Sequence, residues 1–248
     1  DVRVRRLLDG LAALRDAYRD RGGDLLVARG DPETVLPALA ERLDADRVVW
    51  NRDYSGLARK RDAGVRQALH DAGIRREAHH DAVLQTPDSI RTNAGDPYSV
   101  YTYYWKKWTD RETDPPAPTP DGRDLVGPDA LAAATDPAET DGGVAPGAGG
   151  DVTSAVDTVA VGDLPTPGDL GFAEPDADVG PAGTDAARER LGAFLSAGVF
   201  GYDDERDSPA HEGTSRLSTF MKYGEIGVRE VYEATKEAMA DAEERPEE

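Results

Sequence analysis

The segment 213–218 combines small hydroxyl side chains with a glycine, a pattern suited to binding an anion. It reads Gly-Thr-Ser-Arg-Leu-Ser and contains the hydroxyl groups of Thr214, Ser215 and Ser218. Hydroxyl groups together with backbone N–H groups at the start of a helix can bind phosphate. The same residues could instead form an ordinary helix cap. The segment is therefore a candidate phosphate site, and the sequence around it must decide between the two interpretations.

The charge of the chain limits which partners it can bind. The 49 Asp and Glu residues outnumber the 29 Lys and Arg residues, which gives a net charge of −20. Such a surface repels nucleic acid in dilute salt. In molar salt the Debye length falls to about 3 Å, so a local arginine can still contact phosphate. We therefore expect a surface suited to high salt, and charge alone leaves the partner open.

Other features of the composition exclude several kinds of site. The chain has no cysteine, which excludes disulfides, thiolate metal sites and cysteine nucleophiles, and its four histidines argue against a metal site. No apolar run approaches the roughly 18 residues that a membrane span requires. We therefore predict a cytoplasmic protein that does not enter a membrane.

The first 80 residues alternate between helical and strand patterns. Apolar residues recur at three- and four-residue spacing in the expected helices, and short apolar runs between them predict strands. Helices are expected at residues 2–18, 32–43 and 59–72, and strands at residues 25–28, 47–50 and, more weakly, 74–78.

Strands that are separated by helices form parallel sheets whose faces the helices cover. The predicted fold class is therefore α/β, with a Rossmann-like doubly wound parallel sheet. Ligands of such sheets bind beyond the C-terminal ends of the strands. Asn51, Arg52 and Asp53 follow the strand at residues 47–50, and we predict that they lie at a ligand site.

The second half of the chain has a different composition. Residues 109–183 are rich in Pro, Asp, Ala, Thr and Gly, and a segment with so few apolar residues is expected to be a long linker. Thr184 is then expected to be the N-cap of a helix that carries Leu191, Phe194 and Leu195. A last helix is expected over residues 228–239.

Three blocks of sequence, taken in order, resemble the photolyase/cryptochrome family. The first block reads Gly-Asp-Pro-Tyr-Ser-Val-Tyr at residues 95–101 and Trp-Lys-Lys-Trp at 105–108. The second runs from Leu-Pro to Leu-Gly-Phe over residues 164–172. The third and most specific, residues 202–229, begins Tyr-Asp-Asp-Glu-Arg-Asp-Ser-Pro and includes the candidate phosphate segment. The resemblance covers nearly the whole chain, although poorly in the linker.

The resemblance implies an antenna-binding α/β domain, a linker and the beginning of an all-α FAD-binding domain. The expected ranges of these three parts are 1–108, 109–183 and 184–248. The family's first strand would precede Asp1, and most of its flavin domain would follow Glu248. We therefore expect that this chain alone is inactive.

Family membership also implies FAD as cofactor, with its phosphates bound by the hydroxyl-rich segment and an upstream tyrosine. The implied FAD-binding residues are Tyr202, Thr214, Ser215, Arg216, Leu217 and Ser218. Members of the family also bind an antenna chromophore, either a deazaflavin or a folate, in the α/β domain.

The antenna residues favour 8-hydroxy-5-deazaflavin over methenyltetrahydrofolate. Leu57 and Ala58 occupy positions where folate-binding members carry polar ligands. Asp53 matches the deazaflavin pattern, in which a carboxylate accepts hydrogen bonds from the pyrimidine-like edge of the ring, and Arg3 and Lys222 match two further positions. Alternatively, Asp53 is a helix cap and the two basic residues are solvated surface charges.

Arg206 matches a family position that contacts the DNA backbone beside the lesion. A guanidinium group can donate two hydrogen bonds to one phosphate. An ion pair with Asp203 or Asp207 is the alternative. The aromatic residues around Trp105 and Trp108 are expected in a core or a domain interface, because aromatic clusters contact cofactors less often.

The resemblance implies a deoxyribodipyrimidine photo-lyase, a carbon–carbon lyase in which reduced FAD and light split a flipped-out cyclobutane pyrimidine dimer. Its partner would be dimer-containing DNA, and we expect a monomer. Three alternatives stay open: a cryptochrome-type blue-light photoreceptor, a non-enzymatic acidic α/β binding module, and an interrupted gene product without activity.

Overall fold

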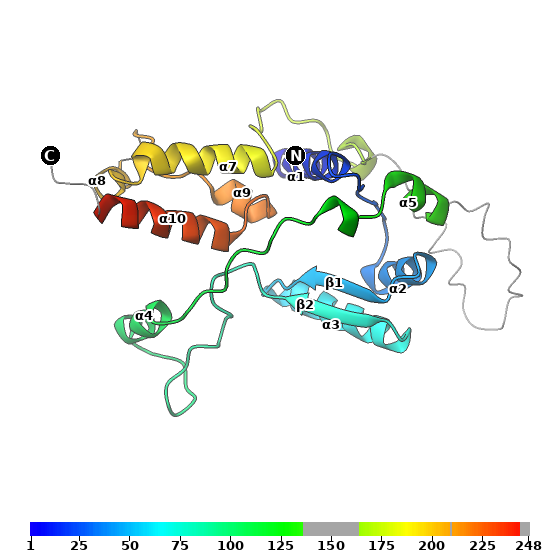
Figure 1. Ribbon diagram of the computed structural model, residues 1–248, viewed down its shortest axis with the longest axis horizontal. Helices are drawn as coiled ribbons and strands as arrows, with labels where there is room; N and C mark the ends of the chain where they lie inside the picture. Colours follow the sequence, from blue (N-terminus) through cyan, green and yellow to red (C-terminus); the bar gives the residue numbers. More distant parts are fainter. Residues whose placement is uncertain (136–163, 209, 244–248) are drawn as a thin grey trace, which may run out of the picture. The chain divides into compact units, whose positions relative to one another are not determined.

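The described part of the chain forms two compact units. The computed structural model describes residues 1–135, 164–208 and 210–243 (Figure 1). The α/β unit comprises Asp1–His79 and Thr119–Gly183, and the helical unit comprises His80–Pro118 and Thr184–Glu248. These packing units share the boundary at residue 183 with the ranges expected from the sequence. Residues 80–108, however, belong to the helical unit, and residues 119–183 belong to the α/β unit.

The α/β unit contains a parallel pair of strands, β1 (Arg47–Asn51) and β2 (Arg75–His79). Val49 lies opposite Glu77 in the register of the pair. The helix α3 (Gly56–Asp71) connects the two strands and packs against α2 (Pro32–Arg42) (Figure 1). The predicted strand–helix–strand order and parallel pairing are therefore confirmed.

Helix caps explain where the helices of this unit begin. The carboxylate of Asp31 accepts a hydrogen bond from the N–H of Glu33 at 3.0 Å, which fixes the start of α2 at Pro32. The hydroxyl of Ser55 caps α3 at the N–H of Ala58. This cap starts α3 at Gly56, three positions before the helix expected from apolar spacing. The helix α1 (Val2–Arg19) follows the predicted range closely.

The strand predicted at residues 25–28 is wrong. The backbone there has no strand assignment, and β1 and β2 are the only paired strands among the described residues. The N–H of Leu25 donates to the carboxylate of Asp24 at 2.7 Å instead of to a neighbouring strand. An apolar run forms a strand only when a partner strand pairs with its backbone groups, and local sequence does not supply that partner.

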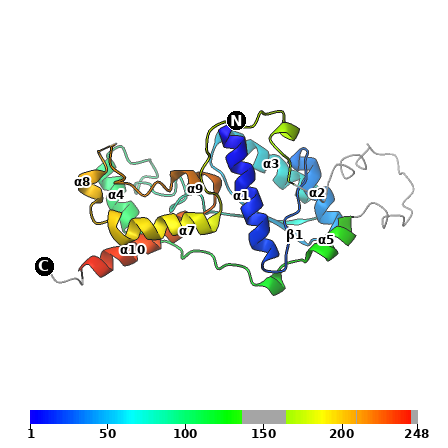
Figure 2. The same cartoon turned by 90° about the horizontal axis from the view of Figure 1, so that it is seen from above.

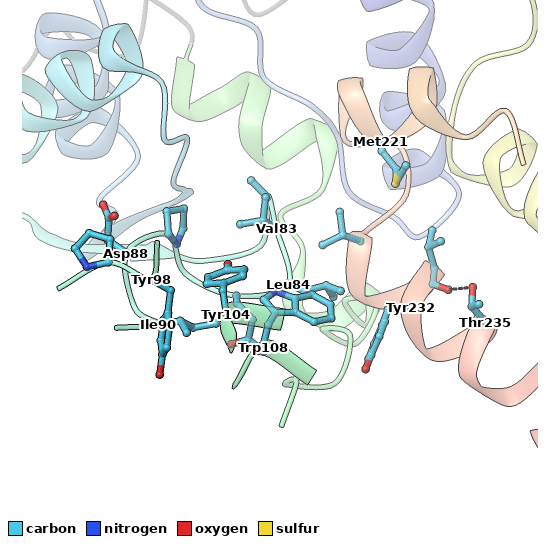
Figure 3. Close-up of a pocket in the computed structure, with 16 residues that line it drawn as sticks. Val83, Leu84, Asp88, Ile90, Tyr98, Tyr104, Trp108, Met221, Tyr232 and Thr235 are labelled. Carbon is cyan, nitrogen blue, oxygen red and sulfur yellow. Dashed lines mark hydrogen bonds between the residues drawn. The ribbon is translucent and has the colours of Figure 1, made fainter. Parts of the chain in front are cut away.

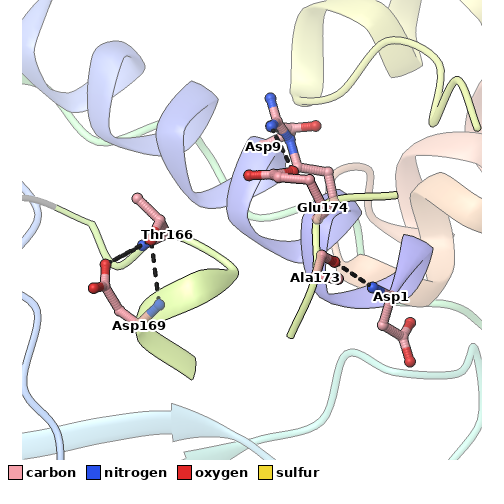
Figure 4. Close-up of polar contacts among 7 residues, drawn as sticks. Asp1, Asp9, Thr166, Asp169, Ala173 and Glu174 are labelled. Atoms are coloured by element: carbon pink, nitrogen blue, oxygen red, sulfur yellow. Dashed lines mark hydrogen bonds and ion pairs between the residues drawn. The ribbon is translucent and has the colours of Figure 1, made fainter. Parts of the chain in front are cut away.

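Part of the expected linker has defined structure. Short helices occur at Gly122–Asp124, at α5 (Pro128–Thr135) and at Gly168–Leu170, whereas residues 136–163 lie outside the described part. The carboxylate of Asp169 accepts hydrogen bonds from the N–H and the hydroxyl of Thr166, at 2.8 and 2.7 Å (Figure 4). The bond from the Thr166 N–H lowers the pKa of Asp169.

The segment at residues 172–174 also contacts α1. Arg5 on this helix pairs with Asp9 at 2.9 Å and with Glu174 at 3.3 Å. Figure 4 shows Glu174 beside Asp9 of the helix. The second sequence block is therefore attached to the α/β unit rather than being a free connection.

The helical unit contains several short helices around a small apolar core. Its helices are α4 (Tyr101–Thr109), α7 (Thr184–Ala193), a π-helical turn (Phe194–Gly198), α8 (Tyr202–Glu205), α9 (Ser218–Tyr223) and α10 (Val228–Glu243). Figures 1 and 2 show α7 and α10 side by side. Thr184 is the first helical residue rather than the predicted N-cap. The buried cluster consists of Ala187, Leu191, Leu217, Phe220 and Ile226.

Arg229 of α10 connects two distant segments of the helical unit. Its guanidinium donates to the carbonyl of His80 at 2.8 Å and pairs with Asp81 at 3.3 Å and Asp114 at 3.5 Å. The side chain is only 12% exposed. A largely buried arginine with these partners holds the segment that follows β2 to α10.

Candidate functional site

The turn at residues 213–218, the hydroxyl-rich turn hereafter, connects α8 to α9. Its first residue, Gly213, is buried against α8. A Cβ atom at this position would lie 2.5 Å from the Cβ of Glu205 and 2.7 Å from its carbonyl carbon. Only glycine permits such a close approach, so the glycine of the motif brings the turn against the end of α8.

Leu217 anchors the other end of the hydroxyl-rich turn. Its side chain is 1% exposed and belongs to the buried cluster with Leu191 and Phe220. Of the predicted FAD-binding residues, Leu217 can therefore offer a ligand only its backbone. Thr214, Arg216 and Ser218 are exposed and Ser215 is half-buried, which leaves the polar groups of the turn accessible.

The middle of the turn has a specific backbone geometry. Arg216 has a φ of 52°, in the left-handed region that non-glycine residues rarely adopt. Arg190 of α7 donates from Nε to the carbonyl of Ser215 at 2.9 Å and from Nη2 to the carbonyl of Thr214 at 3.4 Å. Sequence reasoning missed Arg190, since nothing in its local sequence signals a contact with a turn 24 residues away.

Tyr202 and Arg206 lie together on α8 and its end. The Arg206 guanidinium carbon lies 5.7 Å from the centroid of the Tyr202 ring, and that ring packs edge-on against Phe194. Arg206 also pairs with Asp203 at 3.1 Å and with Asp207 at 4.0 Å. The ion pair considered as the alternative for Arg206 is therefore present, while half of the side chain remains exposed.

Asp53 lies in the loop that follows β1, as predicted for a ligand site at the end of a parallel strand. Its carboxylate accepts a hydrogen bond from the N–H of Ser55 at 2.9 Å, and this bond lowers the pKa of Asp53. The helix cap proper is Ser55 rather than Asp53. The Asp53 carboxylate therefore stays ionised and exposed, with one oxygen bonded to its own loop.

A cavity of about 450 Å³ lies beside the C-terminal end of β1. Trp50, Asn51 and Asp62 line it, together with apolar residues from residues 26–39. Asp62 is 4% exposed and accepts a hydrogen bond from the indole Nε1 of Trp50 at 3.3 Å. The cavity therefore has an apolar wall and a buried carboxylate, but Asp53 is not among its lining residues.

The remaining predicted antenna residues are divided between the units. Arg3 belongs to the α/β unit, where its side chain is 85% exposed and pairs with Asp1 at 3.1 Å. Lys222 belongs to α9 of the helical unit. The α/β unit thus contains Arg3 and Asp53 but not Lys222.

The helical unit has a second cavity, of about 830 Å³, with an aromatic lining (Figure 3). Tyr98, Tyr104 and Trp108 come from the first sequence block, and Tyr232 comes from α10. No residue of α4 is buried, so Tyr104 and Trp108 do not lie in a core, which was one of the two places expected for this aromatic cluster; the other was a domain interface. Trp108 also stacks on Trp105 with ring centroids 5.3 Å apart.

A metal site and a membrane span are both absent from the described residues. These residues contain no group of three side chains that could hold a metal ion. No helix in the described ranges is long and apolar enough to cross a bilayer. The functional groups that the structure brings together are thus the hydroxyl-rich turn and the two cavities.

Comparisons with known proteins identify the family that combines an α/β unit and a helical unit of this kind. The family model for DNA photolyase matches residues 1–121. The deoxyribodipyrimidine photo-lyase of Halobacterium salinarum is 53% identical over 242 residues, covering 97% of this chain and 45% of that protein. An uncharacterized 31.6 kDa protein of Synechococcus is 34% identical over 241 residues. The match covers 97% of this chain and 75% of that protein.

The fold agrees with these sequence matches. The crystal structure of a class III photolyase from Agrobacterium tumefaciens superposes with a TM-score of 0.68 at 30% identity, over 94% of this chain and 44% of that one. The chain belongs to the DNA photolyase/cryptochrome family. Its α/β unit has the Rossmann-like fold of the family's antenna domain. The chain spans a little under half the length of the named photolyases that it matches.

Proposed function

We propose that this chain is part of a deoxyribodipyrimidine photo-lyase that uses FAD and light to split cyclobutane pyrimidine dimers in DNA. The observation that carries the proposal is the 53% identity, over nearly the whole chain, to a protein of that name. Family membership argues against the interpretation as an unrelated acidic binding module. The proposed enzyme is cytoplasmic, since its substrate is cellular DNA, and we propose that it acts as a monomer.

The proposed contribution of the helical unit is to bind the phosphates of FAD. The hydroxyl groups of Thr214 and Ser218 are exposed on the hydroxyl-rich turn, and the phenol of Tyr202 lies at the start of α8. Hydroxyl and backbone N–H groups are suitable donors to a diphosphate. When bound, the flavin would supply the electron that splits the dimer, while these residues orient it.

The proposed contribution of the α/β unit is to bind the antenna chromophore, 8-hydroxy-5-deazaflavin. Asp53 supports this choice, because its ionised carboxylate can accept hydrogen bonds from a ring N–H at the end of β1. The cavity beside Trp50 would accommodate an apolar part of the ligand. Arg3 would then act as its cationic partner within this unit.

Methenyltetrahydrofolate is the alternative antenna, and the aromatic cavity offers a place where its planar ring could stack. The aromatic cavity of the helical unit presents Tyr98, Tyr104 and Trp108 to a planar ligand (Figure 3), and stacking on such side chains stabilises a planar ring. Loss of a folate spectrum on Trp108→Ala, with deazaflavin binding unchanged, would identify this alternative.

Contact with DNA is proposed for Arg206. Its guanidinium retains exposed surface despite the ion pair with Asp203, and arginine can exchange a carboxylate for a phosphate without changing its own geometry. High salt would screen the repulsion from the acidic surface, and the Arg206 contact with phosphate would itself weaken as salt rises.

The test of the cofactor proposal is an absorption spectrum of the chain after incubation with FAD and deazaflavin in high salt, followed by gel filtration. Retained FAD, lost on Ser215→Ala but not on Ser196→Ala, would support the hydroxyl-rich turn. Ser196 is a matched control, because its hydroxyl lies in the same unit and donates only to the carbonyl of Ala193. Flavin retention that Ser215→Ala leaves unchanged would contradict the proposed site.

The test of the activity is light-dependent repair of a dimer-containing oligonucleotide by the full gene product. Repair that requires both light and FAD would support the photo-lyase. Bound flavin without repair would instead identify a cryptochrome-type photoreceptor.

A further inference from the structure

Arg190 contacts the hydroxyl-rich turn from the side of α7. Its guanidinium bridges two successive carbonyl groups, those of Thr214 and Ser215. A guanidinium group offers several N–H donors in one plane. A single side chain therefore holds two consecutive peptide groups of the turn.

This contact also orients the N–H groups of the turn. In a trans peptide, the carbonyl of one residue and the N–H of the next point in opposite directions. A carbonyl of Thr214 directed at Arg190 therefore turns the N–H of Ser215 away from α7. The same holds for the carbonyl of Ser215 and the N–H of Arg216. In the described part of the chain, neither N–H group has a hydrogen-bond acceptor.

The backbone of the turn needs such support. The left-handed conformation of Arg216 is unfavourable for a residue with a Cβ. Leu217 fixes the end of the turn through its burial in the core, but it does not hold the peptide groups before Arg216. The Arg190 side chain supplies that constraint, since both of its contacts lie on the residues just before the strained position.

We propose that Arg190 is a positioning residue for phosphate binding, which holds the N–H groups of Ser215 and Arg216 toward the diphosphate of the ligand. This inference rests on the proposed function of the hydroxyl-rich turn. Arg190 itself contacts carbonyl groups and not the ligand. Its positive charge behind the turn additionally favours a bound anion.

Arg188 provides a matched control on the same helix. It pairs with Glu230 of α10 through bonds of 2.6 and 3.2 Å and does not contact the turn. Arg188→Gln therefore removes the same charge and a similar pair of hydrogen bonds. An effect of total charge would appear in both variants, whereas a positioning effect appears only in Arg190→Gln.

The experiment is a titration of the isotope-labelled chain with inorganic pyrophosphate, followed by NMR of the backbone amides. In the wild-type chain and in Arg188→Gln, we expect pyrophosphate to shift the amide signals of Ser215 and Arg216. In Arg190→Gln the affinity should fall about tenfold. Arg190→Lys keeps the charge but replaces the planar guanidinium, which donates from two nitrogens, with a single ammonium nitrogen, and it should also weaken binding. Unchanged signals of Leu191 would show that the core remains folded.

Several outcomes would overturn the inference. Equal pyrophosphate affinity of Arg190→Gln and the wild-type chain would do so, and so would wild-type affinity of Arg190→Lys. Absence of a shift at Ser215 and Arg216 in the wild-type chain would overturn it even if FAD is retained. Conversely, a pyrophosphate response that depends on Arg190, in a chain that does not retain FAD, would support the positioning role and contradict the proposed cofactor.

Discussion

The hydroxyl-rich turn of the helical unit and the loop after β1 in the α/β unit are both candidate cofactor sites, but they are supported differently. The turn is stabilised by contacts with the rest of the helical unit: Leu217 is buried in the core of that unit, and Arg190 of α7 donates hydrogen bonds to the turn. The loop is stabilised by a hydrogen bond between its own residues, because the carboxylate of Asp53 accepts a bond from the N–H of Ser55. In the turn the side chains that support the structure differ from the hydroxyl groups proposed to bind ligand, whereas in the loop the Asp53 carboxylate has both roles.

This difference determines how each site should respond to substitution. Because Leu217 and Arg190 stabilise the turn, its hydroxyl groups stay available to a ligand. Loss of either contact should therefore lower both stability and ligand affinity. In the α/β unit, the residues that stabilise the strands, such as Asp62, can be changed separately from Asp53. The predictions below test this distinction from the largest expected effect to the smallest.

Leu217→Ala should lower the free energy of unfolding of the helical unit by about 2–5 kcal/mol, as expected when a fully buried leucine is truncated. Urea unfolding followed by hydrogen exchange of α7 and α9 would measure the loss. Leu57→Ala is the control, because Leu57 is 83% exposed and should change stability by less than about 0.5 kcal/mol. Equal effects of the two substitutions would show that Leu217 does not anchor the turn.

Asp62→Ala should destabilise the α/β unit by about 2 kcal/mol, because the buried carboxylate accepts bonds from Trp50 and Arg61. Thermal unfolding monitored by circular dichroism would measure the change. Asp71→Ala is a suitable control, since Asp71 is exposed and bonds only to Gln67. Binding of FAD should be unaffected by both substitutions, and a loss of FAD with Asp62→Ala would contradict separate support of the two sites.

Asp24 should make the α/β unit sensitive to acid. Hydrogen bonds from Arg19, with a further contribution from Arg15, lower the pKa of Asp24 to about 2 from an ordinary value of 3.8. Because the pKa is depressed in the folded state, its contribution of about 1–2 kcal/mol is complete well above pH 3.8 and is lost as the pH falls through about 2. Comparison of unfolding across this range for wild type and Asp24→Asn would measure it. The variant should be less stable at neutral pH and show a flatter profile, and identical profiles would refute the assignment.

Arg206→Gln should produce the smallest effect. Loss of one phosphate contact is expected to reduce the slope of log affinity against log salt by about one, when binding of dimer-containing DNA is followed by fluorescence anisotropy. Arg91→Gln is the matched control, because Arg91 has similar exposure and pairs with Asp88 three residues away, as Arg206 does with Asp203. Equal slopes for the two variants would contradict the proposed DNA contact and indicate that Arg206 forms only its ion pair.

The sequence predicted those features that depend on local patterns. Apolar spacing located α1 and α2, and the order of strands and helices predicted the parallel pairing of β1 and β2. The strand at residues 25–28 was predicted wrongly, since an apolar run does not indicate whether a partner strand is present. Helix α3 began earlier than expected because the cap at Ser55 outweighs apolar periodicity.

The candidate site was predictable only in part, for a similar reason. The hydroxyl groups of the turn are visible in the sequence because they are adjacent. The contact of Arg190 with the carbonyls of Thr214 and Ser215 joins residues 24 and 25 positions apart. Because every residue has a backbone carbonyl, residue types do not show which carbonyl accepts the bond. The aromatic cavity was also missed, since aromatic spacing alone does not distinguish a pocket wall from a core.

The most direct test of the central claim is hydrogen exchange of the chain with and without FAD. We predict that FAD slows exchange of the N–H groups of Ser215 and Arg216 in the helical unit and leaves those of the loop at residues 52–55 unchanged. Protection confined to that loop, or none at the hydroxyl-rich turn, would contradict the proposed flavin site.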